Sequence, residues 1–238
     1  MIPYLALAAM PAVLSLFFPN RLNYADLSVK RQAERKYLFL CGLILFLFLA
    51  LRSRGIGSTA NYYNMMRRAI AADSWQEYYN PERVEIGFQF FTFALSRVFH
   101  SAQTIIVVSA AIYTVSIAYS VYCNSHDVVF SMIMYVTLGL MQFEMQGMRQ
   151  SIAMSICLFA YEAAKKRKII PFMLLILLAM QFHQTAVVFA VIYIIFWLKY
   201  KWNYIFAFIA ISGVFFYSSN YIIGFANELF DRHYYTSV

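Results

Sequence analysis

Three short polar segments interrupt an otherwise apolar chain, and each carries side chains that could bind an anion or accept a proton. They read RSRGIGSTANYY at 52–63, FEMQGMRQS at 143–151 and QFHQT at 181–185. An arginine guanidinium offers a planar fork of donors that fits the oxygens of a phosphate group. Histidine and glutamate are the commonest general bases. These residue types indicate a site for a phosphate-containing ligand, with a base beside it.

Arg149 is the most informative single residue, because it opens the apolar run 148–164. Arginine at the centre of a bilayer costs about 2.5–3.5 kcal/mol, and each Leu or Ile returns only about 0.3–0.6 kcal/mol. Two interpretations are open. The side chain reaches back to the membrane surface, or it forms an anion site in a water-filled cavity, where the start of its own helix adds free N–H groups.

His183 stands between two apolar runs. It is either a partner in a hydrogen bond between helices or part of a functional site. Glu85 and Glu144 are further candidate bases. The other histidines are scattered and the three cysteines match no ligand spacing, so we predict no metal site.

The composition is typical of a membrane protein. The chain is 62% hydrophobic and only 13% charged, with a mean hydropathy of +0.61, whereas a water-soluble domain carries about 25% charged residues. The net charge of +8 does not indicate nucleic-acid binding, because the basic residues lie in short segments between apolar runs.

The apolar runs predict an all-α fold, a polytopic integral membrane bundle of eight to nine hydrophobic helices. The runs are 2–18, 37–51, 84–99, 102–122, 127–143, 148–164, 169–182, 184–198 and 204–226. Neither a repeat nor a long linker divides the chain, so 1–238 is expected to form a single transmembrane domain.

Lysine positions predict the orientation. All seven lysines fall in three polar stretches: Lys30 and Lys36, then Lys165, Lys166 and Lys168, then Lys199 and Lys201. Lysine beside a membrane segment marks the cytoplasmic side. The polar segment 52–83 is then external, and Arg52, Arg149 and His183 share the outer side. The run 169–198 has lysine at both ends, so we expect a hairpin that turns near His183.

The run 84–99 does not fit the alternation of crossings. Its polar residues Glu85, Gln89, Thr92 and Ser96 form one helical stripe. This favours a re-entrant or interfacial helix, although a short span with its stripe facing other helices is the alternative.

Within the external segment, two further features are predicted. Asp73 is expected to cap a short helix. Trp75, Tyr78 and Tyr79 are expected at the level of the lipid headgroups.

The polar segments, in this order, resemble the EpsG/Wzy-type family of bacterial exopolysaccharide (O-antigen- or capsule-like) polymerases. The matching elements are Arg52 with Gly57-Ser58-Thr59 and Tyr62, Glu85 with Gly87-Phe88, Arg149-Gln150-Ser151-Ile152-Ala153, and Phe182-His183-Gln184-Thr185-Ala186. The family usually has Asp where this chain has Thr59. Family members also usually continue into further membrane helices, so we expect this chain, which stops at Val238, to be either a fragment or a short member.

The resemblance implies a glycosyltransferase in the bacterial cytoplasmic (inner) membrane, with its active face on the external, periplasmic side. It would join oligosaccharide repeat units carried on undecaprenyl diphosphate, which is itself the activated donor, so no cofactor is implied. The candidate residues for binding diphosphate and sugar are Arg52, Arg54, Tyr62, Arg149 and Gln150. The candidate catalytic residues are Glu85 and His183.

The implied partners are the lipid-linked oligosaccharide, the bilayer, and chain-length regulator and flippase proteins. The alternative is a non-enzymatic membrane protein, either a transporter of lipid-linked sugar or an assembly partner of the polysaccharide machinery. A transporter is expected to show inverted repeats and charged residues at both faces, and the sequence shows neither.

Overall fold

The computed structural model describes residues 2–18, 27–53, 58–81 and 84–196, with two short pieces at 212–214 and 217–218. Residues Met1–Phe196 form one compact unit and Trp197–Val238 a second. The described residues therefore exclude Lys199, Lys201 and nearly all of the apolar run 204–226. A single domain over 1–238 stays a prediction.

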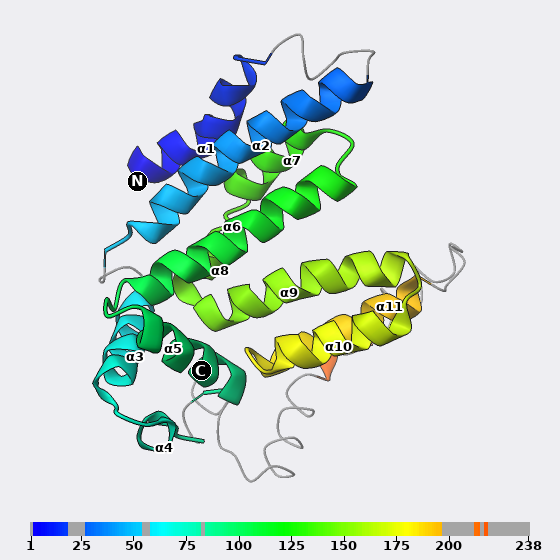
Figure 1. The fold of residues 1–238 in the computed structure, drawn as a ribbon. Coiled ribbons are helices and arrows are strands. Elements are labelled where there is room, and N and C mark those ends of the chain that lie inside the picture. The colour runs from blue at the N-terminus through cyan, green and yellow to red at the C-terminus, as the bar shows by residue number, and fades with distance from the viewer. Residues whose placement is uncertain are drawn as a thin grey trace. The chain divides into compact units, whose positions relative to one another are not determined.

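Every regular element in the described residues is a helix, which confirms the all-α prediction (Figure 1). The elements are α1 (Ile2–Ser15), α2 (Leu27–Ala50), α3 (Thr59–Ala71), α4 (Trp75–Tyr78), α5 (Ile86–Val98), α6 (Thr104–Asn124), α7 (Val128–Thr137), α8 (Gln142–Gln146), α9 (Met148–Lys165), α10 (Ile169–Met180), the 3-10 helix η1 (Gln184–Ala190) and α11 (Val191–Ile195).

Long helices pack side by side in the first unit, in the order α2, α6, α9 and α10, and α1 packs on α7 (Figure 1). Buried Tyr37 and Leu45 of α2 meet Tyr113 of α6 in the largest core cluster. Small residues on α9, such as Ala160 and Ala164, are fully buried against α10. Small side chains let two helix backbones approach closely.

One helix in the described residues, α6, is both long and apolar enough to cross a membrane by itself. Its 21 residues give a length of about 32 Å, against about 30 Å for the hydrocarbon core. The shorter apolar helices cover Ala6–Ser15, Ile86–Val98, Val128–Thr137, Ile169–Met180 and Gln184–Ile195. The polytopic arrangement stays a prediction.

Lys30 lies near the start of α2 and Lys165 ends α9, whereas Arg52 follows α2 and Arg149 lies at the start of α9. In Figure 1 these are opposite ends of the packed helices. At one end, Arg31 donates to the carbonyl of Tyr122 at 3.1 Å, and Lys165 donates to Asn124 at 2.6 Å. These bonds join the start of α2 to the end of α6 and the end of α9. The opposite ends of the same helices adjoin α3, α5 and the turn at His183.

The predicted hairpin is present. Helix α10 ends at Met180, the chain turns through 181–183, and η1 returns along α10 until Tyr193 donates to the carbonyl of Arg167 at 3.2 Å. The returning arm begins as a 3-10 helix rather than an α-helix. Several β-branched residues lie in this arm, and these lower α-helix propensity.

Two local predictions were wrong. The run 127–143 is not one helix, because α7 ends at Thr137 and Gly139 adopts a left-handed φ of 71°. The Leu140 N–H then bonds back to the Tyr135 carbonyl, the closing bond of a helix C-terminus. Likewise Ser74, not Asp73, caps α4, because its hydroxyl accepts from the Glu77 N–H at 3.3 Å.

Candidate active site

Glu85 is the centre of the first cluster of charged side chains. Its carboxylate forms an ion pair with Arg149, the second residue of α9. Its other oxygen, Oε1, lies 3.4 Å from Nδ1 of His183 and accepts the N–H of Gln184 at 3.3 Å. The structure thus brings together three residues that the sequence had singled out in three separate segments.

The cluster is partly open to solvent. The side chain of Glu85 is 11% exposed, that of Arg149 27% and that of His183 25%. A charged pair at this depth keeps access to a ligand while water is partly excluded, which strengthens electrostatic contacts. Nδ1 of His183 makes no well-aligned hydrogen bond in the described part of the chain, so its contact with Glu85 is one of proximity.

Gly87 explains how Glu85 reaches His183. The Phe88 N–H donates to the carbonyl of Gln181 at 3.1 Å, so the start of α5 lies directly against the end of α10. A Cβ atom on Gly87 would lie 2.7 Å from the Gln181 carbonyl oxygen, well inside van der Waals contact. Only glycine permits this approach, and the approach places Glu85 beside the turn that carries His183.

An apolar cavity of about 420 Å³ opens beside His183, between α6, α9, η1 and α11. Gln150, His183 and Thr185 line the end that adjoins the charged cluster. Apolar side chains such as Met154, Leu158 and Ile192 line the rest. A polar end joined to an apolar trough suits an amphiphilic ligand.

Arg52 lies in a second, closed cluster. Its guanidinium forms an ion pair with Glu144 of α8, and its Nε donates to the Thr59 hydroxyl at 3.0 Å. The two charged side chains are 1% and 0% exposed. Burial lowers the pKa of Arg52 to about 10, which leaves it protonated at neutral pH. The neighbouring Ser58 hydroxyl donates to the carbonyl of Gln146.

The two clusters are linked through the chain rather than through side chains. Glu144 precedes Arg149 by a few residues, with the end of α8 and Gly147 between them. Arg52 therefore holds the segment that leads into Arg149, whereas the sequence predicted that both arginines meet one diphosphate. In this arrangement each arginine has its own carboxylate partner.

The remaining predicted residues have simpler surroundings. Tyr62 is buried on α3 and packs edge-to-face on Phe88, with ring centroids 5.6 Å apart. Gln150 folds over Gly147 and reaches the apolar cavity. Arg54 lies outside the described residues. Sequence reasoning named Glu144 as a base and missed its pairing with Arg52, for which the sequence carries no local signal.

The polar stripe of α5 is buried. A stripe that faces other helices was expected if the run 84–99 is a short span rather than an interfacial helix. Gln89, Thr92 and Ser96 are at most 3% exposed, and the Ser96 hydroxyl bonds to the carbonyl of Ala69 on α3. The stripe thus faces other protein segments. Whether α5 crosses the membrane stays a prediction.

These features describe an all-helical protein with a carboxylate, an arginine and a histidine gathered at one end beside an apolar cavity. The EpsG family model matches residues 35–237, and the chain belongs to the EpsG family. No curated protein and no solved structure matches the chain significantly. Family membership indicates a function like that of a polysaccharide polymerase, a kind of glycosyltransferase, with a lipid-linked oligosaccharide as substrate. Together with the apolar helix α6, it also indicates a membrane-associated protein.

Proposed function

We propose that this protein is a bacterial polysaccharide polymerase that joins undecaprenyl-diphosphate-linked oligosaccharide repeat units at the outer face of the cytoplasmic membrane. The observation that carries the proposal is the meeting of Glu85, Arg149 and His183 at one end of an apolar cavity. A lipid diphosphate needs both a cationic site for its head and an apolar site for its tail, and here the two adjoin.

The separation of lysines from this cluster supports an external active face. Lysine-rich ends favour the cytoplasmic side, and the cluster lies at the other end of the same helices (Figure 1). Helix α10 has 12 residues, about 18 Å, which is less than the hydrocarbon thickness of about 30 Å. The turn at His183 would therefore lie recessed below the outer surface of a multi-pass bundle, with 52–83 as an external polar segment.

The reaction needs one bond formed and one broken. An acceptor hydroxyl oxygen attacks the anomeric carbon of the donor sugar, and the bond from that carbon to the diphosphate oxygen breaks with its electron pair. His183 takes the hydroxyl proton, and Glu85 stabilises the imidazolium that forms. Glu85 is suited to this positioning role, because it already accepts from Arg149 and the Gln184 N–H.

Arg149 supplies the electrostatic part of catalysis. Its Nη1 is used by Glu85, and a guanidinium carries five N–H donors, so others remain for the diphosphate. Charge grows on the leaving diphosphate as the bond breaks, and donors already in place stabilise that charge. The start of α9 adds the positive end of its helix dipole.

The other candidate residues take supporting roles in the proposal. Gln150 orients the donor at the mouth of the cavity, and the cavity holds part of the isoprenoid chain. Arg52 acts through Glu144 on the segment before Arg149, and Tyr62 supports α5 through Phe88. Arg54 is a further contact for the diphosphate. A chain-length regulator and a flippase are the proposed partner proteins.

The test uses cells that carry His183→Ala or Arg149→Ala, with Arg67→Ala as the control. Arg67 is an exposed arginine of α3 and takes no part in the ion pairs and hydrogen bonds described for either cluster. We expect both site variants to lose long-chain polysaccharide at normal protein level, and the control to keep it. Unchanged polymer in the site variants would instead support a non-enzymatic transporter or assembly partner.

A further inference from the structure

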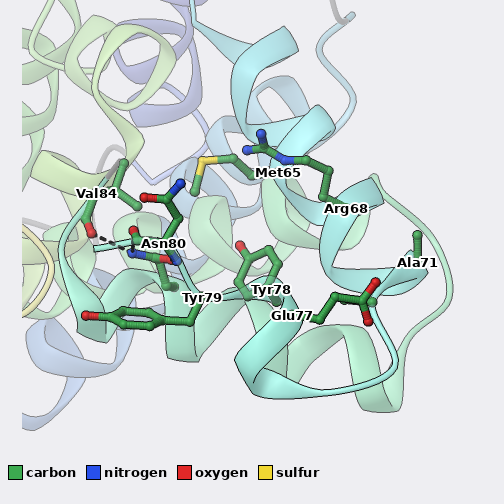
Figure 2. A pocket seen from close by; sticks show the side chains of 10 residues that line it. Met65, Arg68, Ala71, Glu77, Tyr78, Tyr79, Asn80 and Val84 are labelled. Carbon is green, nitrogen blue, oxygen red and sulfur yellow. Dashed lines mark hydrogen bonds between the residues drawn. The ribbon is translucent and has the colours of Figure 1, made fainter. Parts of the chain in front are cut away.

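A second cavity, of about 370 Å³, lies between α3, α4 and the start of α5, mostly within the segment predicted to be external. Its lining differs from that of the first cavity in being polar and aromatic. The lining includes Arg68 from α3 and Glu77, Tyr78, Tyr79 and Asn80 from the segment around α4, and Figure 2 shows Tyr78 between Arg68 and Tyr79. None of these residues belongs to the cluster around Glu85.

We propose that this cavity binds an oligosaccharide, the acceptor glycan of the polymerase; the assignment to the acceptor rests on the proposed function. A sugar presents hydroxyl groups around its rim and patches of C–H on its faces. Aromatic faces pack on the C–H patches. Planar guanidinium, carboxylate and amide groups pair with neighbouring hydroxyls, and Arg68, Glu77 and Asn80 supply one of each.

The walls are held in place before any ligand binds. Tyr79 stacks on Trp75 with ring centroids 5.2 Å apart, and Tyr78 stacks on Phe93 at 5.8 Å. Trp75 in turn packs edge-on against Phe93 of α5 at 5.6 Å. Rings fixed in this way lose little entropy when a ligand binds.

The floor is fixed by a single side chain of α5. The Gln89 amide donates to the carbonyls of Asn80 at 2.8 Å and Val84 at 2.7 Å, and its oxygen accepts the Asn80 N–H at 3.0 Å. These bonds satisfy the buried amide and tie Asn80 and Val84 to α5; Figure 2 shows Asn80 and Val84 beside the cavity. Tyr78 and Tyr79 line this cavity, and their place at the level of the lipid headgroups stays a prediction.

The position of the cavity suits an acceptor rather than an unrelated sugar. Val84 lines the cavity and is the neighbour of Glu85, and Gln89 lies one helical turn beyond Glu85. One turn advances about 5.4 Å along a helix. A glycan seated in the cavity therefore has its near end within reach of the cluster that would activate its hydroxyl.

Two adjacent arginines give a matched test. Both side chains are exposed, but Arg68 lines the cavity and Arg67, the residue before it on the same helix, does not. The probe is the repeat-unit oligosaccharide released by mild acid from lipid-linked intermediates of the producing cells. Binding to the full chain in nanodiscs is measured by saturation-transfer NMR and by Trp fluorescence.

We expect Arg68→Ala and Asn80→Ala to weaken binding of this probe about tenfold, since each removes hydrogen bonds to hydroxyls. Arg67→Ala keeps wild-type affinity. Tyr79→Phe keeps the ring and most of the binding, and Tyr79→Ala loses it, which separates loss of the stacking face from loss of folding. Wild-type protein that does not bind the probe, or an Arg68→Ala variant that binds it normally, overturns the proposal.

His183→Ala distinguishes this proposal from the polymerase itself. If the glycan site and the polymerase function are both correct, His183→Ala binds the oligosaccharide normally and makes no polymer. Arg68→Ala then makes less polymer or shorter chains. If His183→Ala makes normal polymer and Arg68→Ala no longer binds the probe, the result contradicts the proposed polymerase function and supports the glycan site. If His183→Ala makes no polymer and Arg68→Ala shows normal polymer and normal binding, the result contradicts only the proposed glycan site.

Discussion

Oε1 of Glu85 lies 3.4 Å from Nδ1 of His183, although Glu85 precedes α5, His183 lies in the turn after α10, and the two residues are far apart in the sequence. The contact exists because Gly87 lets α5 approach the turn after α10. A carboxylate in this position can orient an imidazole and stabilise its charged form. The division of roles between these two candidate bases follows from this geometry.

Replacing Glu85 by glutamine tests that division. Glu85→Gln keeps the size of the side chain and removes its charge. We expect polymerisation by isolated membranes to fall on the order of 10- to 100-fold, the range for loss of a group that supports a catalytic residue. Glu162→Gln, at the lysine end of α9, serves as the control. A Glu85→Gln variant of wild-type rate would show that the carboxylate charge has no catalytic part.

Gly87→Ala tests the close approach itself. The added methyl group meets the Gln181 carbonyl and pushes α5 away from the His183 turn, so we expect most activity to be lost while the protein still folds. Gly42→Ala on α2 is the matched control, since its Cβ would lie 4.0 Å from Ala118, an ordinary contact. There, alanine in a helix interior should stabilise by up to about 1 kcal/mol. Activity and thermal unfolding in detergent measure both effects.

The buried ion pair of Arg52 and Glu144 predicts an effect on the stability of the fold. Arg52→Ala leaves Glu144 as an unpaired buried charge, which typically costs about 3–5 kcal/mol. We expect a sharply lowered unfolding temperature or lost protein. The double variant Arg52→Met with Glu144→Leu removes both charges and should recover much of the stability. A single variant as stable as wild type would contradict the buried pairing.

Cys123 offers a native probe of orientation. Of the three cysteines only Cys123 is exposed, and it lies at the lysine end of α6. We expect a membrane-impermeant maleimide to label it only when the cytoplasmic face is accessible. Asn64→Cys, on the exposed face of α3 and in a Cys123→Ser background, should be labelled from outside. The reverse pattern would place the candidate active site inside the cell.

Part of the fold could be predicted because its signals are local. Lysines at both ends of one apolar run predict the hairpin around His183, and the stripe of α5 marks a face that is buried. The break after Thr137 also had a local signal in Gly139, but hydrophobicity continues through it. The sequence could not decide between Asp73 and its neighbour Ser74 as the cap of α4, because the capping position depends on the backbone angles.

The pairing of charges could not be predicted in the same way. More than one pairing is possible among Arg52, Arg149, Glu85 and Glu144, and each observed pair joins segments far apart in the chain. The structure pairs Arg52 with Glu144 and Arg149 with Glu85. Thr59, where the family usually has Asp, accepts a hydrogen bond from Arg52, and Glu144 provides the negative charge. The ion pair of Arg52 with Glu144 joins segments far apart in the chain, so it leaves no local signal in the sequence.

The most direct test of the central claim is polymerisation by purified protein in proteoliposomes supplied with undecaprenyl-diphosphate-linked repeat units. The wild type is expected to form lipid-linked dimers and longer chains and to release undecaprenyl diphosphate in equal measure with each bond formed. His183→Ala and Arg149→Ala are expected to form neither product, while Arg67→Ala matches the wild type. Chain growth at the wild-type rate without His183 and without Arg149 would contradict the account.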